Sequence, residues 1–210
     1  LIETSSDGAL AAPRCVFWMG SMTVSRNVFL VGMPGVGKST VGRLLAGALD
    51  REFIDSDEEI VRRNGVEIAT IFEIEGEAGF REREAAVINL FTMRSPIVLA
   101  TGGGAILRED SRRILRERGL VVYLRASLDM LEARTQKKRG NQTTSRTRPL
   151  LEGPNRRLTL ETFLAVRGPL YEETAHVIVD VSAAPRGKFL QTLLDAIDDA
   201  TSGRATPTST

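Results

Sequence analysis

One short stretch constrains this chain more than any other, the run Gly32–Thr40, which reads Gly-Met-Pro-Gly-Val-Gly-Lys-Ser-Thr. Its spacing matches the phosphate-binding pattern G-x-x-x-x-G-K-[ST]. Glycines let the backbone turn tightly and bring its N–H groups against phosphate oxygens, and a following helix adds partial positive charge. The flanks agree, because Asn27–Val31 predicts a buried strand and Thr40–Leu49 predicts an amphipathic helix. The stretch therefore predicts a nucleoside triphosphate site.

The residue types within this loop predict how it would hold the nucleotide. Lys38 is expected to neutralise the β- and γ-phosphates, and Ser39 to offer its hydroxyl to Mg²⁺. A glycine-rich turn with an incidental lysine is the alternative, but the flanking strand and helix favour binding. The loop residues expected to contact ATP are Gly35, Val36, Gly37, Lys38, Ser39 and Thr40.

Composition is that of an ordinary globular protein, with 42% hydrophobic and 26% charged residues among 210, enough for one domain with a sizeable core. A net charge of +1 gives no overall field for nucleic acid or an anionic membrane. No apolar run approaches the ~18 residues that a membrane span needs. A single cysteine, Cys15, excludes an intramolecular disulfide. We expect a cytoplasmic protein without nucleic-acid or membrane partners.

The ends of the chain differ from its middle. Residues 1–21 lack the apolar stretch of a secretory signal, so we interpret them as a disordered N-terminal extension. Residues 22–200 are expected to form a single domain built on the phosphate loop, and the Ser/Thr-rich residues 201–210 a disordered tail. Residues 136–152 are polar, basic and aperiodic. Such a tract is typical of a linker or a nucleic-acid patch, but its place between two predicted helices favours a lid over bound phosphates.

Strands and helices alternate through the domain. After the first strand, further strands are predicted over residues 52–55, 96–100, 120–124 and 177–179, with helical patterns between them and over residues 189–197. This alternation predicts a three-layer α/β/α fold around a five-stranded parallel sheet. Ligands of such sheets sit at the carboxyl ends of the strands. Asp55, Gly102–Gly104 and the phosphate loop all fall there, so we expect them to surround one crevice.

Five further motifs follow the phosphate loop in order, namely Phe53-Ile54-Asp55-Ser56-Asp57, Gly79-Phe80-Arg81, Thr101-Gly102-Gly103-Gly104, Arg148-Pro149-Leu150-Leu151 and Arg167-Gly168-Pro169-Leu170-Tyr171. With the loop, this set resembles the shikimate kinase family, which has a nucleoside-monophosphate-kinase-like fold, over residues 24–197. The resemblance implies ATP-dependent phosphorylation of the 3-hydroxyl of shikimate, in aromatic amino-acid biosynthesis. It further implies Mg²⁺ as cofactor, shikimate and ATP as partners, and a monomer.

The resemblance also implies which residues hold the acceptor. Asp57 looks like the residue that binds the shikimate hydroxyls, and it could accept the proton of the attacking hydroxyl. Arg81 and Arg167 look like the pair that grips the substrate carboxylate, a task that suits the planar fork of arginine. Gly103 resembles the glycine whose backbone approaches the substrate.

On the nucleotide side, Asp55 is similar to the aspartate that orients Mg²⁺ beside Ser39. Arg148 looks like a lid arginine that reaches the phosphates. Arg134 resembles the arginine that flanks adenine, with Pro185 as the other neighbour. Residues 140–147 look like an insertion in the lid, so Arg139 and Arg146 are alternatives to Arg148. The catalytic residues on this interpretation are Lys38, Asp57 and Arg148.

Each of these residues has a plainer interpretation. Arg81 lies in a charged run typical of a solvated helix face, and Arg167 could pair with a carboxylate at a helix end. Asp57 could be the N-cap of a helix beginning at Glu58. Gly102–Gly104 could be a loose turn, although glycines directly after a buried strand favour close approach of a ligand. The only histidine, His176, is interpreted as structural.

Two other functions remain open at this point. One is a related small-molecule kinase of the gluconate or nucleotide type, against whose nucleotide form the paired arginines argue. The other is a non-catalytic domain that senses a ligand. Lys38, Ser39, Asp55 and Asp57 argue against the sensor, because it would need no machinery for Mg²⁺ and phosphate.

Overall fold

The computed structural model of this protein describes residues 26–136, 155–183 and 187–202. Within them, five parallel strands form one sheet in the order β2-β3-β1-β4-β5. The strands are β1 (Asn27–Val31), β2 (Glu52–Asp55), β3 (Ile97–Ala100), β4 (Gly119–Arg125) and β5 (Val177–Asp180). The predicted five-stranded parallel sheet is therefore confirmed. The expectations for residues 1–21, Arg148, Pro185, nearly all of the lid and most of the tail fall outside the described residues.

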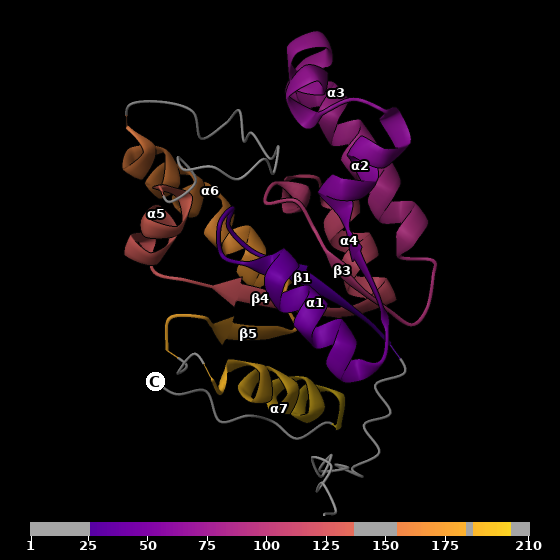
Figure 1. Ribbon diagram of the computed structural model, residues 1–210, viewed down its shortest axis with the longest axis vertical. Helices are drawn as coiled ribbons and strands as arrows, with labels where there is room; N and C mark the ends of the chain where they lie inside the picture. Colours follow the sequence, from indigo (N-terminus) through magenta and orange to yellow (C-terminus); the bar gives the residue numbers. More distant parts are fainter. Residues whose placement is uncertain (1–25, 137–154, 184–186, 203–210) are drawn as a thin grey trace, which may run out of the picture.

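Helices cover both faces of this sheet, which makes the three predicted layers (Figure 1). Helices α1 and α7 contact each other on one face, whereas α3, α4 and α6 pack on the other. Helix α2 and the first part of α3 stand beyond the sheet at the top of Figure 1. The helices are α1 (Lys38–Leu49), α2 (Ser56–Asn64), α3 (Ile68–Phe91), α4 (Glu109–Arg118), α5 (Leu128–Gln136), α6 (Arg156–Thr174) and α7 (Phe189–Ser202), with a 3-10 helix η1 (Ala105–Leu107).

The central strand β1 carries the phosphate loop at its carboxyl end. It pairs with β3 on one side and β4 on the other, so that Phe29 lies between Leu99 and Val121. All five of its residues are buried. A parallel strand covered by helices on both faces needs such a continuous apolar run, which is why the sequence predicts it well. The loop is thus anchored in the most buried part of the molecule.

The predicted apolar stripe of α1, Val41, Leu44, Leu45, Ala48 and Leu49, is confirmed only in part. An apolar stripe that includes Leu44 and Ala48 is expected to be buried, but Leu44 is 56% exposed and Ala48 is also exposed. The buried face instead holds Val41, Leu45 and Ala46 together with Gly42. A Cβ at position 42 would overlap the Phe53 ring, so the helix lies on β2 at this glycine. Val41 and Leu45 are thus buried as predicted, whereas the close approach of Gly42 to β2 accompanies the exposure of Leu44 and Ala48.

Several helix ends follow their sequence signals. Gly65 ends α2 with a φ of 70°, and Gly76 interrupts α3 with a φ of 69° and a ψ of −173°, both as glycine predicts. Helix α7 continues to Ser202, past the predicted end at 197. His176 accepts a hydrogen bond at Nδ1 from the N–H of Val121 at 3.0 Å, which agrees with a structural role.

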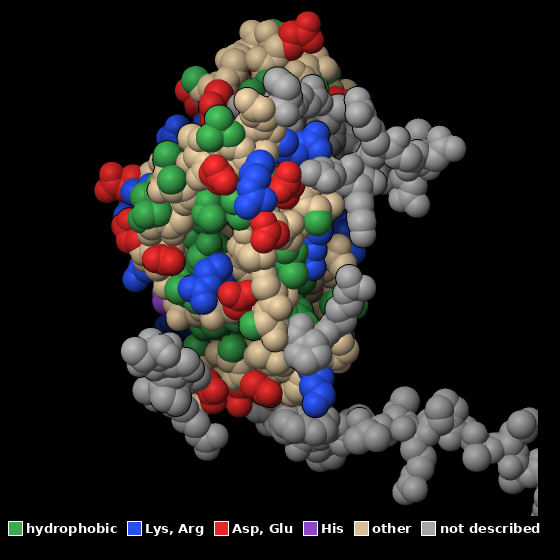
Figure 2. Space-filling view, turned by 90° about the vertical axis from the view of Figure 1, so that its left-hand side faces the viewer, with side chains coloured by type: hydrophobic (Ala, Val, Ile, Leu, Met, Phe, Trp, Pro, Cys, Tyr) green, Lys and Arg blue, Asp and Glu red, His purple; other side chains and the backbone are tan. Residues whose placement is uncertain are grey.

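Charges of both signs are mixed on the surface. On the face that Figure 2 shows, Lys and Arg side chains are interspersed with Asp and Glu. Arg157, for example, pairs with Asp129 at 2.8 Å and with Glu132 at 2.7 Å. That face has no continuous basic surface, in agreement with the balanced composition. None of the described helices is both long enough and apolar enough to cross a bilayer.

One buried side chain, Asn27, ties the start of β1 to the segment that enters β3. Its Nδ2 donates to the carbonyls of Thr92 at 3.2 Å and Arg94 at 2.7 Å. Its Oδ1 accepts from the N–H of Ile97 at 3.0 Å. The amide thus satisfies three backbone groups that lie far from it in the sequence, which holds the central strands in register.

We predict that Asn27→Ala lowers the free energy of unfolding by about 3 kcal/mol, because it leaves buried backbone groups without partners. Urea denaturation monitored by circular dichroism measures this difference. Asn155→Ala is a matched control, since Asn155 is exposed and its side chain makes no capping bond to α6. The control should change stability by less than about 0.5 kcal/mol. Equal effects of the two substitutions would contradict the assignment.

Candidate active site

The phosphate loop connects β1 to α1. Gly32, Gly35 and Gly37 have φ values of 144°, 89° and 105°, a region that residues with a Cβ rarely adopt. Lys38 is 9% exposed, and its ammonium group donates to the carbonyls of Gly32 at 2.6 Å and Met33 at 3.1 Å. The lysine is therefore held against the loop where the phosphates are expected.

Arg134 reaches the same loop from α5. Its Nη1 donates to the carbonyl of Val36 at 2.6 Å. A Cβ placed on Gly37 would lie 3.6 Å from that nitrogen. The guanidinium group thus lies beside the backbone that is expected to bind phosphate, which brings it to the predicted nucleotide site. Arg148 and Pro185, predicted for the same site, lie outside the described residues.

Asp55 joins the loop to the end of β2. Its Oδ2 accepts a hydrogen bond from the hydroxyl of Ser39 at 2.6 Å. Its Oδ1 accepts from the N–H groups of Asp57 at 3.0 Å and Glu58 at 3.4 Å, which makes Asp55 the N-cap of α2. The helix begins at Ser56, so the alternative in which Asp57 caps a helix beginning at Glu58 is wrong. Capping therefore does not account for Asp57.

The three glycines after β3 are required by what packs against them. A Cβ on Gly102 would overlap Glu84 and would lie 2.9 Å from Oδ1 of Asp57. A Cβ on Gly103 would lie 2.7 Å from the Pro34 ring, which belongs to the phosphate loop. A Cβ on Gly104 would overlap the guanidinium group of Arg81. This stretch is therefore a tightly packed meeting point, which excludes the loose turn.

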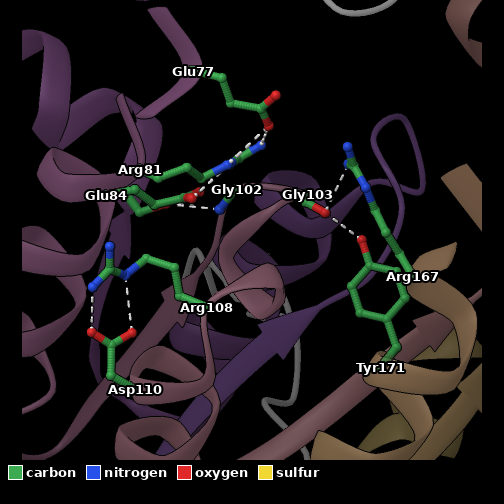
Figure 3. Close-up of polar contacts among 10 residues, drawn as sticks. Glu77, Arg81, Glu84, Gly102, Gly103, Arg108, Asp110, Arg167 and Tyr171 are labelled. Atoms are coloured by element: carbon green, nitrogen blue, oxygen red, sulfur yellow. Dashed lines mark hydrogen bonds and ion pairs between the residues drawn. The ribbon is translucent and has the colours of Figure 1, made fainter. Parts of the chain in front are cut away.

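Arg81 lies on one side of this glycine loop (Figure 3). It is only 9% exposed, so the solvated helix face expected from its charged neighbours is wrong. It forms an ion pair of 2.6 Å with Glu84 and another of 2.9 Å with Glu77. These carboxylates fix the guanidinium group against Gly104. Arg81 is thus held rigidly beside the glycine loop.

Glu84 is a buried neighbour of Arg81 that the sequence did not single out. Its side chain is 2% exposed, and its Oε1 accepts no hydrogen bond from any described residue. Burial raises the pKa of Glu84 to about 7, and the charge of Asp57 acts in the same direction, whereas Arg81 opposes it. The only available signal was its place three residues after Arg81, on the same face of a helix.

Arg167 lies on the other side of the glycine loop, on α6. It is 5% exposed, and its Nη1 donates to the carbonyl of Gly103 at 3.2 Å (Figure 3). Burial lowers the pKa of Arg167, and the positive charge of Arg81 lowers it further, because the two cations are close. Within the described residues Arg167 forms no ion pair with a carboxylate, so the helix-end pairing proposed as its plainer role is not observed.

Comparison with known proteins identifies the family of this chain. The family model described as "Shikimate kinase" matches residues 34–198. A shikimate kinase from Bordetella avium is 46% identical over 196 residues, which cover 93% of this chain and 88% of that protein. The chain belongs to the shikimate kinase family. A second relative in this family, from Burkholderia pseudomallei, is 53% identical over 154 residues, which cover 73% of this chain and 80% of that protein.

Solved structures agree with this family. The shikimate kinase from Acinetobacter baumannii, in complex with shikimate, is 42% identical with a TM-score of 0.76 and covers 87% of this chain and 97% of its own. A gluconokinase from Sinorhizobium meliloti, at 21% identity and a TM-score of 0.53, covers 85% of this chain and 95% of its own and shares the fold alone. The chain thus has the P-loop kinase fold of the family and is an enzyme of the shikimate kinase type.

The pKa of Glu84 leads to a prediction for a shikimate kinase with this site. A carboxyl group whose pKa is raised in the folded state stabilises the protein below its unfolded pKa, and this contribution is lost as the pH rises through about 7. Between pH 5 and pH 8, the wild type should therefore lose stability relative to Glu84→Gln, by on the order of 2 kcal/mol. Urea denaturation at each pH measures the difference.

The exposed neighbour Glu82 supplies the control, because Glu82→Gln removes a carboxylate from the same helix turn without touching a buried group. This variant should follow the pH dependence of the wild type. A constant stability difference between Glu84→Gln and the wild type from pH 5 to pH 8 would contradict the raised pKa.

Proposed function

We propose that this chain transfers the γ-phosphoryl group of ATP to the 3-hydroxyl of shikimate and releases shikimate 3-phosphate and ADP. One observation carries the proposal for this member of the family. Two buried guanidinium groups, those of Arg81 and Arg167, lie on either side of a glycine loop that also contacts Asp57 and the phosphate loop. An acidic alcohol and a triphosphate could therefore be held next to each other.

The carboxylate of the acceptor would bind between the two arginines. Arg81 already has two carboxylate partners, whereas Arg167 has none among the described residues. The charges of Glu77 and Glu84 act on Arg167 from beyond ion-pair distance, and burial lowers its pKa, so an incoming carboxylate in direct contact would stabilise the buried cation. Arginine can also bind a carboxylate through two parallel hydrogen bonds, which would fix the orientation of the ring. Because Arg81 is already paired and, within the described residues, Arg167 is not, Arg167 would contribute most to binding the carboxylate of the acceptor.

The proton of the attacking hydroxyl would pass to Asp57. Its Oδ1 lies against Gly102, next to the loop that the acceptor would contact. A carboxylate within hydrogen-bond reach of the hydroxyl can hold it in line with the γ-phosphate and take its proton during transfer.

The phosphates would be held by the backbone of the loop, with Lys38 and Arg134 beside it. Mg²⁺ fits the observed donors, because Ser39 and Asp55 present adjacent hard oxygens, 2.6 Å apart. Magnesium sites in kinases commonly use one or two protein oxygens together with phosphates and waters. The described residues contain no cluster of three or more His, Cys, Asp or Glu side chains that could hold a metal ion. A magnesium ion bound partly by phosphates and waters does not need such a cluster. When bound, Mg²⁺ would neutralise charge on the β- and γ-phosphates.

The proposal is tested by ADP release from MgATP with shikimate, quinate or gluconate offered in turn. We expect turnover with shikimate and at least about tenfold lower kcat/KM for the other two acids, since each differs in the hydroxyls presented to Asp57. Preferred turnover of gluconate would favour the gluconate-type kinase. Shikimate binding without any ADP release would favour the sensor.

The role of Asp57 has a separate test. Asp57→Asn keeps the size of the side chain but removes the proton acceptor, so kcat should fall about 100-fold or more while the KM for ATP changes less than about twofold. Steady-state kinetics with each substrate varied measures both quantities. Glu58→Gln is the control, because Glu58 is exposed and pairs with Arg43 on the surface. An unchanged kcat for Asp57→Asn would remove Asp57 from the mechanism.

A further inference from the structure

Three side chains spaced four residues apart form one stripe on α6, namely Phe163, Arg167 and Tyr171. Residues at this spacing lie on the same face of a helix. The guanidinium carbon of Arg167 lies 3.9 Å from the centre of the Phe163 ring, within the range of a cation–π contact. Phe163 thus supports the flat face of the guanidinium group from one helical turn away.

Tyr171 meets Arg167 at a single acceptor atom, the carbonyl oxygen of Gly103. The tyrosine hydroxyl donates to this oxygen at 2.5 Å, and Nη1 of Arg167 donates to it at 3.2 Å (Figure 3). Two donors from one helix therefore hold one peptide group of the glycine loop. Because the C=O and N–H of a trans peptide point in opposite directions, this contact also sets the direction of the Gly104 N–H.

The geometry points to Tyr171 as a positioning residue, whose hydroxyl holds the Gly103 carbonyl so that Arg167 presents the rest of its guanidinium fork to the carboxylate of the acceptor. This inference rests on the proposed function, because it assumes that Arg167 binds that carboxylate. On this inference Tyr171 would contact neither substrate and would act through Gly103 and Arg167.

The surroundings of Tyr171 make it a rigid donor. The residue is fully buried, and its ring stacks on Tyr123 with 4.9 Å between centroids and 17° between planes. Burial raises the pKa of Tyr171, so the hydroxyl keeps its proton and remains a donor throughout the physiological pH range. A donor fixed in this way can hold the loop without adjusting to it.

The carbonyl that Tyr171 holds belongs to the residue that also touches the nucleotide side. Gly103 packs directly on the ring of Pro34, in the phosphate loop. Any movement of Gly103 would therefore shift Arg167 relative to the phosphates. A misplacement of reacting groups by a small distance has large effects on transfer, so the contact at Gly103 links the position of Arg167 to that of the phosphate loop.

The test uses Tyr171→Phe in the complete chain, which removes one hydroxyl and keeps the stacked ring. We expect the KM for shikimate to rise about tenfold, the size of one lost buried hydrogen bond, while the KM for ATP stays within about twofold. Isothermal titration with shikimate should show the same loss of affinity. A merely structural role would lower the melting temperature without separating the two KM values.

Tyr123→Phe is the matched control, because Tyr123 is in the same ring stack but does not contribute a donor to Gly103. Its KM values should equal those of the wild type. In an Arg167→Ala background, Tyr171→Phe should add less than about a twofold change, because the hydroxyl acts through Arg167. An undiminished tenfold effect in that background, or an unchanged KM for shikimate in the single variant, would overturn the inference.

Phe163→Leu supplies a second variant should Tyr171→Phe fail to fold. It removes the aromatic face beneath Arg167 but keeps apolar volume, so it should also raise the KM for shikimate without changing the KM for ATP. An unchanged KM for shikimate would overturn the inference that Arg167 must be held in position to bind the acceptor. A wild type that turns over no shikimate contradicts the proposed function. Normal wild-type turnover with unaffected variants contradicts only the role given to Tyr171.

Discussion

The active site of this protein depends on the absence of side chains at positions 102–104. Each of the three glycines lies against a different part of the site, the carboxylates of Glu84 and Asp57, the Pro34 ring and the guanidinium group of Arg81. A single methyl group at any of them would meet an atom closer than van der Waals contact allows. The glycine loop thus works as a spacer of minimal thickness between the proposed acceptor site and the phosphate loop.

Burial gives the charges around this spacer their strength. Arg81 is compensated by Glu77 and Glu84, whereas no carboxylate among the described residues pairs with Arg167. Electrostatic interactions are stronger in such a poorly solvated place than in water. Arg81 is therefore fixed by its own ion pairs, whereas Arg167 has carboxylates nearby but none in direct contact among the described residues. The same burial raises the pKa of Glu84, so the site contains a carboxyl group that titrates near neutral pH.

Much of the architecture could be predicted because its signals are local. The strands β1 and β2 were predicted with their observed bounds. For β1 the signal was a short apolar run that leads into the glycine-rich loop. Gly65 and Gly76 likewise ended or broke helices where the sequence placed them. The buried face of α1 was predicted only in part, because Leu44 and Ala48 are exposed and Gly42 approaches Phe53, a residue on another element. The alternative that Asp57 caps α2 placed the N-cap two residues too late. Asp55 and Asp57 are both suitable capping residues, and only the observed start of the helix at Ser56 distinguishes them.

Taken by itself, the sequence determined that this chain has a phosphate-binding loop on a buried strand, an alternating α/β fold and a set of motifs typical of one kinase family. These features depend on residue type and short spacing, which local physics restricts strongly. Only the tertiary structure decided that Glu84 and Asp57 both lie against Gly102, and that Arg81 forms ion pairs while Arg167 forms none among the described residues. It also decided that Tyr171 shares the Gly103 carbonyl with Arg167. These are contacts between residues far apart in the chain, and their energies come from burial and packing that no short stretch of sequence specifies.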